Sequence, residues 1–212
     1  MPDFDAVVLA ADQLNAGGET PGLALEQFAK RCLAQGDSWF TIGGVPPWIT
    51  TNLLSHMVFS SRACIVNCAL PGKQLAHMVD TTRHRRFLQL LRGPTAHKWD
   101  VILLSGGGND LIDAALSPPT AERAKRLLLT AAEWDSTLPV PARYLSSEGW
   151  ATFVAHINAV FDLLLVERDK GINAPTPVVL HSYDVAVPRN AGAGFGIGPW
   201  LHAAFDLYAI PL

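Results

Sequence analysis

Short, continuous apolar runs that alternate with longer stretches of helical period constrain the fold of this 212-residue chain most strongly. Strands that are apolar at nearly every position are typical of parallel sheets, in which crossover helices bury both faces. The sequence therefore predicts an α/β domain. The runs that we interpret as strands are residues 31–35, 63–70, 100–105 and 178–183.

Helical spacing of apolar residues predicts the elements between these strands. Residues 73–92 carry apolar side chains on one face and a basic run on the other, which indicates a crossover helix. Further helices are predicted over 118–133 and from Ser146 or Ser147 to Gly171. The tail, residues 188–212, shows neither a fifth strand nor a closing helix, so we expect the domain to lack its last strand and helix.

The predicted domain organisation is simple. Residues 1–30 are expected to form an appended helical extension, and residues 31–212 one α/β domain. With 49% hydrophobic and 17% charged residues, the chain is suited to a single globular core.

Charge and cysteine content exclude several classes of protein. A formal net charge of -3 gives no general attraction to nucleic acid or to anionic membranes. The three cysteines are too few and odd in number for a disulfide framework, which favours a reducing compartment. The N-terminus lacks the basic region of a secretory signal, and no segment approaches the roughly 20 apolar residues of a membrane span. We therefore expect a cytoplasmic protein.

Polar and glycine residues follow each of the first three predicted strands. The first strand is followed by Gly-Asp-Ser-Trp at 36–39, the second by Leu-Pro-Gly at 70–72, and the third ends in Ser-Gly-Gly-Gly-Asn-Asp at 105–110. The carboxyl ends of parallel strands meet at one edge of a sheet, where active sites gather.

The residue types at this edge are those that acyl transfer requires. Ser38 would supply the nucleophile and its own backbone N–H, Gly72 a second backbone N–H, and Asn109 a side-chain amide. A hydroxyl nucleophile with two or three donors aimed at the developing oxyanion is the usual arrangement for this chemistry.

These blocks resemble those of the SGNH or GDSL-type hydrolases. The first block is similar to residues 36–39, with Trp39 where leucine is commonest, and the third to residues 107–110; the second rests on Gly72. The resemblance covers about residues 31–184. It implies a three-layer, flavodoxin-like fold, an esterase or lipase-type activity on esters, thioesters or acetylated sugars, and an orienting role for Asp37 in its turn.

The fourth block of that family, Asp-x-x-His, is absent from this sequence. The reverse order occurs at the end of the fourth predicted strand, where His181 precedes Asp184. Three interpretations stay open: the block lies beyond Leu212; His181, oriented by Asp184, replaces the missing base; or the protein binds acylated or carbohydrate ligands without turnover.

Other ligand classes find no support in the sequence. The glycines of residues 192–198 lack dinucleotide-binding spacing, and residues 105–110 lack the lysine of a P-loop. No His or Cys pair has metal-ligand spacing. We therefore expect no cofactor and no metal, a small-molecule ester as substrate, and neither nucleic acid nor membrane as partner. A sheet edge left without its last strand favours a homo-oligomer.

Overall fold

The computed structural model describes residues 3–14, 24–41, 52–80, 85–183, 187–192 and 198–211. They fall into two compact units. The first comprises Met1–Gly106 and Val160–Ser182, and the second Gly107–Ala159 and Tyr183–Leu212. The predicted domain of residues 31–212 is thus divided between both units.

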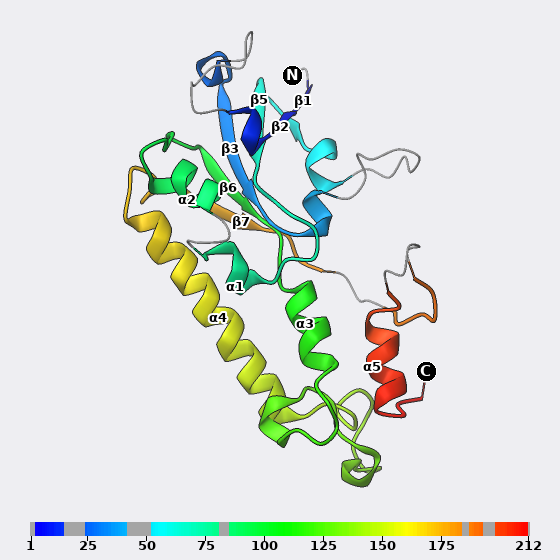
Figure 1. Ribbon diagram of the computed structural model, residues 1–212. Helices are drawn as coiled ribbons and strands as arrows, with labels where there is room; N and C mark the ends of the chain where they lie inside the picture. Colours follow the sequence, from blue (N-terminus) through cyan, green and yellow to red (C-terminus); the bar gives the residue numbers. More distant parts are fainter. Residues whose placement is uncertain are drawn as a thin grey trace. The chain divides into compact units, whose positions relative to one another are not determined.

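A five-stranded parallel sheet forms the centre of the first unit (Figure 1). Its order is β2-β5-β3-β6-β7, and the four predicted strands are confirmed as β3, β5, β6 and β7. A separate antiparallel pair joins β1 to β4. The strands are β1 Phe4–Asp5, β2 Val7–Ala10, β3 Lys30–Gln35, β4 Val58–Phe59, β5 Ala63–Asn67, β6 Val101–Leu104 and β7 Val178–Leu180.

The order of the four central strands is that of a flavodoxin-like sheet. Taken along the chain, β3, β5, β6 and β7 lie in the order 2-1-3-4, the first four positions of the order 2-1-3-4-5. Among the described residues after β7 there is no strand in the fifth position. At this edge Val179 and Leu180 are 52% and 44% exposed.

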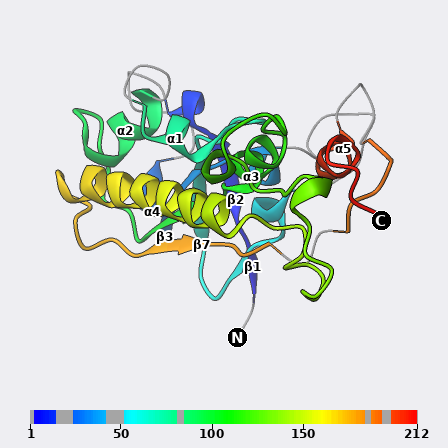
Figure 2. The same cartoon turned by 90° about the horizontal axis from the view of Figure 1, so that it is seen from below.

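Helices cover one face of the sheet. The amphipathic helix α2, Arg85–Arg92, and the C-terminal half of α4, Ser147–Asp169, lie on the same side of β7 (Figure 2). Their side chains pack against the strands in a common core, in which Phe87 of α2, Leu164 of α4 and Leu33 of β3 are all buried.

The opposite face is covered by 3₁₀ turns. Phe40 of the turn Ser38–Phe40 and Leu54 of the turn Leu53–His56 are buried against Cys32, Ile65 and Leu103 of the sheet. The sheet therefore has a layer on each face, which confirms the α/β, three-layer prediction.

The helical extension predicted for residues 1–30 is wrong in its described parts. They contain β1, β2 and two 3₁₀ turns, Ala11–Gln13 and Leu25–Gln27. The β-branched residues Val7 and Val8 fit an extended strand, and β2 pairs with the outer edge of β5.

The predicted helices have mixed outcomes. The helix from residue 147 is confirmed as α4. Residues 73–92 form two helices, α1 Leu75–Met78 and α2, with residues 81–84 outside the described part of the chain. The helix predicted over 118–133 is wrong: only the 3₁₀ turns Arg123–Lys125 and Ala131–Glu133 form there. The tail, predicted without a helix, contains α5, Leu201–Leu207.

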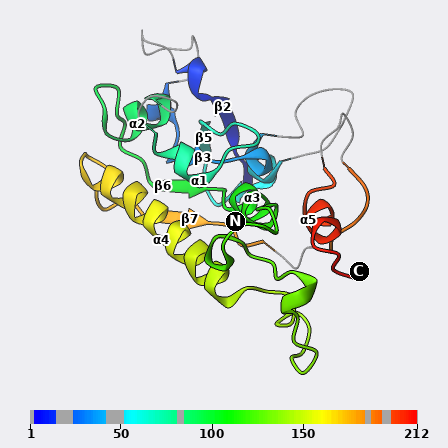
Figure 3. The ribbon, with the colours of Figure 1, turned by 60° about the horizontal axis from the view of Figure 1, so that its bottom comes forward.

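The second unit has a small core of its own. Helix α3, Gly108–Ala115, contacts α5 (Figure 3). Tyr208, just after α5, is buried and donates a 2.6 Å hydrogen bond to the carbonyl oxygen of Ser117. This contact ties the end of the described chain to the segment that follows α3.

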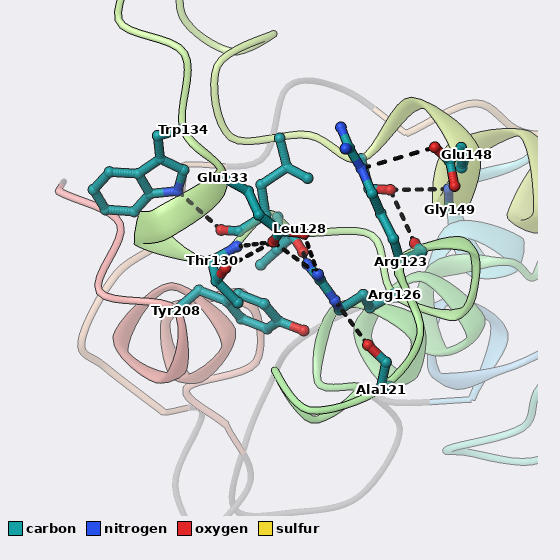
Figure 4. Close-up of polar contacts among 12 residues, drawn as sticks. Ala121, Arg123, Arg126, Leu128, Thr130, Glu133, Trp134, Glu148, Gly149 and Tyr208 are labelled. Carbon is teal, nitrogen blue, oxygen red and sulfur yellow. Dashed lines mark hydrogen bonds and ion pairs between the residues drawn. The ribbon is translucent and has the colours of Figure 1, made fainter.

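The buried Arg126 explains why residues 118–133 do not form a helix (Figure 4). Its guanidinium donates to the carbonyl oxygens of Ala121 and Leu128 and, at 2.6 and 2.7 Å, to both carboxylate oxygens of Glu133. Glu133 also accepts from the backbone N–H and the hydroxyl of Thr130. Carbonyls that a side chain binds in this way are withdrawn from helical hydrogen bonds, so the segment winds around the ion pair.

Helix α4 is more apolar than the sequence analysis expected. An 18-residue window within it has a mean hydropathy of 1.5, and by length and composition alone it could cross a membrane. Val160 and Leu164 are buried in the first unit, whereas Leu163 and Val166 are about half exposed. Only 17% of that window is buried, and a single helix of this kind is weak evidence for a membrane.

We predict that Arg126→Met destabilises the protein by about 3 kcal/mol, because it leaves the Glu133 carboxylate without its partner. Urea unfolding followed by circular dichroism measures the change. Lys125→Met is the control, since Lys125 pairs with Glu122 on the surface and its loss should cost less than about 1 kcal/mol. Equal losses in the two variants would contradict the structural role of Arg126.

The interaction of Glu133 with Arg126 and Thr130 should become weaker in acid. The hydrogen bonds from Arg126, followed by those from Thr130, lower the pKa of Glu133 from 4.5 to about 2. A depressed carboxyl pKa stabilises the fold above pH 4.5, and this contribution is lost as the pH falls from 4.5 towards 2. Glu133→Gln should therefore be less stable than the wild type at neutral pH, and the difference should shrink in unfolding curves recorded through that acid range. A constant difference would refute this linkage.

Candidate active site

The turn after β3 carries the predicted nucleophile. Asp37 caps this turn, and its Oδ1 accepts a 3.2 Å hydrogen bond from the backbone N–H of Trp39. Ser38 is half-buried at the first position of the turn, and Trp39 is 50% exposed. Within the described ranges the Ser38 hydroxyl has no hydrogen-bond partner.

The ends of the neighbouring strands hold this turn in place. The pairing of β3 continues past the strand, because the N–H of Leu70 donates to the Gly36 carbonyl oxygen at 3.0 Å. Asn67 at the end of β5 donates from Nδ2 to the carbonyl oxygen of Phe40 at 2.9 Å. Gly72 follows two residues after Leu70, in a turn with φ of +72°, a conformation that favours glycine.

Three strand ends meet at the hydroxyl of Ser105. Its Oγ donates to Asp37 Oδ1 at 2.7 Å and lies 2.8 Å from Nε2 of His181, which directly follows β7. Ser105 is fully buried and Asp37 is 1% exposed. A chain of hydrogen bonds in such a buried place is strengthened by the low local dielectric.

His181 lies against the turn that carries Ser38. Its ring centroid is 6.1 Å from the ring centroids of both Trp39 and Phe40. Its Nδ1 is 3.3 Å from the carbonyl oxygen of Ser182. The structure thus brings His181 to the predicted turn, while its recorded side-chain hydrogen bond there goes to Ser105.

Gly36 allows the turn and the end of β6 to approach closely. A Cβ atom at this position would lie 2.7 Å from Cβ and 2.8 Å from the carbonyl oxygen of Ser105. Only a residue without a side chain fits this space.

Two predicted site residues are not placed with this group. Asn109 lies in the first turn of α3, in the second unit, so its part in an oxyanion hole stays a prediction. Asp184, the predicted partner of His181, lies outside the described residues.

Sequence analysis missed Ser105 and Asn67. Ser105 is the last residue of a predicted strand and the first of the stretch that leads to Asn109, and Asn67 lies within another predicted strand. A polar residue at the carboxyl end of a buried strand is the signal that could have identified Ser105, since such an end faces the predicted site. Asn67 carried no such signal, because the predicted strand ran on to residue 70 whereas β5 ends at Asn67.

Neither a metal site nor a cysteine nucleophile emerges from the described part of the chain. No group of three or more His, Cys, Asp or Glu residues in it could hold a metal ion. Burial raises the pKa of Cys32 and Cys68 to about 12 and that of Cys64 to about 11, which keeps them as thiols.

Comparisons with known proteins give little further information. No protein-family model matches the chain, and no curated protein matches it. Among solved structures, an extracellular lipase from Streptomyces rimosus is 18% identical, with 85% of this chain and 71% of the lipase covered, at a TM-score of 0.38. A TM-score of this size does not establish a common fold.

We predict that Gly36→Ala lowers the free energy of unfolding by about 3 kcal/mol, because the added methyl group collides with Ser105. Gly72→Ala is the matched control: its methyl group would meet no atom within 4 Å, and it should cost only about 1 kcal/mol for the left-handed backbone. Chemical denaturation of both variants measures these changes. A smaller loss for Gly36→Ala than for Gly72→Ala would show that the close approach is not a constraint.

Proposed function

We propose that this protein is a serine hydrolase that cleaves a carboxylic ester through an acyl-enzyme on Ser38. The observation that carries the proposal is the turn itself. A half-buried serine opens it, a buried carboxylate caps it, and a histidine ring lies against it. The resemblance of residues 36–39 and 107–110 to SGNH-type hydrolases supports the same chemistry.

The proposed reaction follows the usual course of acyl transfer. Ser38 Oγ attacks the ester carbonyl as a base takes its proton, and the backbone N–H groups of Ser38 and Gly72 with the amide of Asn109 stabilise the oxyanion. The alcohol leaves with a proton. Water then attacks the acyl-enzyme and releases the acid from Ser38.

Histidine is the natural choice for the base, and His181 is the candidate in this chain. Its position against Trp39 and Phe40 supports this role. We propose a small acyl or acetyl ester, or a thioester, as the substrate class, with the exposed Trp39 as a surface for it. The reaction as written needs no cofactor, and we propose that the protein acts in the cytoplasm.

A second candidate function is binding of acylated or carbohydrate ligands without turnover. One observation favours it: Nε2 of His181 is hydrogen-bonded to Ser105 and not to Ser38. A serine without a hydrogen-bonded base is a weak nucleophile.

A fluorophosphonate probe distinguishes the two functions. We predict covalent labelling of the wild-type protein on Ser38, detected by intact mass and by the labelled peptide, and its complete loss in Ser38→Ala. Ser136→Ala is the matched control, because this exposed serine lies outside the turn and its loss should leave the label on Ser38 unchanged.

Circular dichroism must first show that each variant is folded. Absence of labelling in a folded wild-type chain would favour the binding function. Labelling that persists in Ser38→Ala would refute Ser38 as the nucleophile.

A further inference from the structure

The Ser105 hydroxyl has one proton and two polar neighbours. Asp37 Oδ1 lies 2.7 Å away and His181 Nε2 lies 2.8 Å away. A hydroxyl group can donate only one hydrogen bond, although it can accept two. The assignment of that single proton therefore decides what His181 can do.

The surroundings of Asp37 place the proton between Ser105 and Asp37. The same carboxylate oxygen that faces Ser105 also accepts the backbone N–H of Trp39, so it acts as an acceptor. If Ser105 did not donate to it, two oxygen lone pairs would face each other at 2.7 Å in a buried site. Ser105 must then accept from its other neighbour, and the donor can only be Nε2–H of His181.

We infer that Ser105 is a positioning residue that holds His181 in the tautomer protonated on Nε2. The lone pair of the neutral ring then lies on Nδ1. The Ser182 carbonyl oxygen also lies near Nδ1, but at 3.3 Å this contact is longer than an ordinary N–H···O hydrogen bond, so the 2.8 Å contact at Nε2 decides the tautomer. The inference rests on the proposed function in so far as His181 is the base of that reaction.

This tautomer decides which nitrogen of His181 accepts the proton of Ser38. A proton from the Ser38 hydroxyl would reach His181 at Nδ1, directly or through one water, while the oxygen forms its bond to the substrate carbonyl. The new Nδ1–H faces the Ser182 carbonyl oxygen at 3.3 Å, which is an acceptor for the imidazolium. Throughout, Asp37 stabilises the positive ring through the Ser105 hydroxyl.

The tautomer is measured by ¹⁵N–¹H NMR of protein labelled with ¹⁵N-histidine, with the His181 signals assigned from the spectrum of His181→Asn. We expect a neutral ring with its proton on Nε2 and protected from exchange with water. In Ser105→Ala this protection should be lost, and in Ser105→Thr, which keeps the hydroxyl, it should remain. A wild-type ring protonated on Nδ1 would overturn the inference without any variant.

The matched control is Thr176→Val. It removes another buried hydroxyl of the first unit, which donates to the Trp99 carbonyl oxygen near the opposite end of β7. It should leave the His181 proton protected. If Thr176→Val also removes the protection of the His181 proton from exchange, then any destabilisation of the fold exposes the ring. That result would refute a specific role for Ser105.

Probe labelling supplies a second, separate readout. Ser105→Ala should slow labelling of Ser38 by about 10²-fold, the usual cost of a misplaced catalytic group, with recovery in Ser105→Thr. An undiminished rate in Ser105→Ala would contradict the positioning role. If the wild type is not labelled at all, the proposed function fails, whereas the NMR spectrum still decides the tautomer.

Discussion

Pairing of β3 on both of its sides is the interaction on which the site depends. Leu33 is in register with Val66 of β5 and with Ile102 of β6, and all three are buried. Because the strands are parallel, their carboxyl ends come together, and the loops that follow begin from fixed positions. The position of each polar group at this edge is thus set by backbone hydrogen bonds in the core.

The sequence was sufficient for the elements that are buried on both faces. Strands β5, β6 and β7 and the centre of β3 are almost uniformly apolar, and this composition has few other interpretations. Strand β2 was not predicted, because six apolar residues between Asp5 and Asp12 do not indicate which edge of a sheet they will join. The helix predicted over residues 118–133 does not form for another reason: the side chain of the buried Arg126 binds carbonyl oxygens of its own segment, which outweighs the helical pattern.

For the candidate active site, the sequence predicts the turn that carries Ser38 but not the residues that hold this turn in place. The short motif at residues 36–39 and the glycine at 72 are visible along the chain. The contact between Asp37 and Ser105 spans 68 residues, and it depends on Gln35 lying opposite Leu104 in neighbouring strands. Pairing register of this kind follows from tertiary structure, and a single sequence does not display it.

The continuation of the sheet hydrogen bonds beyond the strands has a consequence for motion. The amide of Ser105 donates to Gln35 and that of Leu70 to Gly36, so both belong to the same ladder as the core strands. Many binding loops open locally at little free-energy cost, which fast amide hydrogen exchange reveals. Here the backbone that supports the Ser38 turn can open only when the sheet opens. The amides of Ser105 and Leu70 should therefore exchange as slowly as those of β3. Any flexibility that ligand binding needs must then come from the side chains of the turn, and first of all from the exposed Trp39.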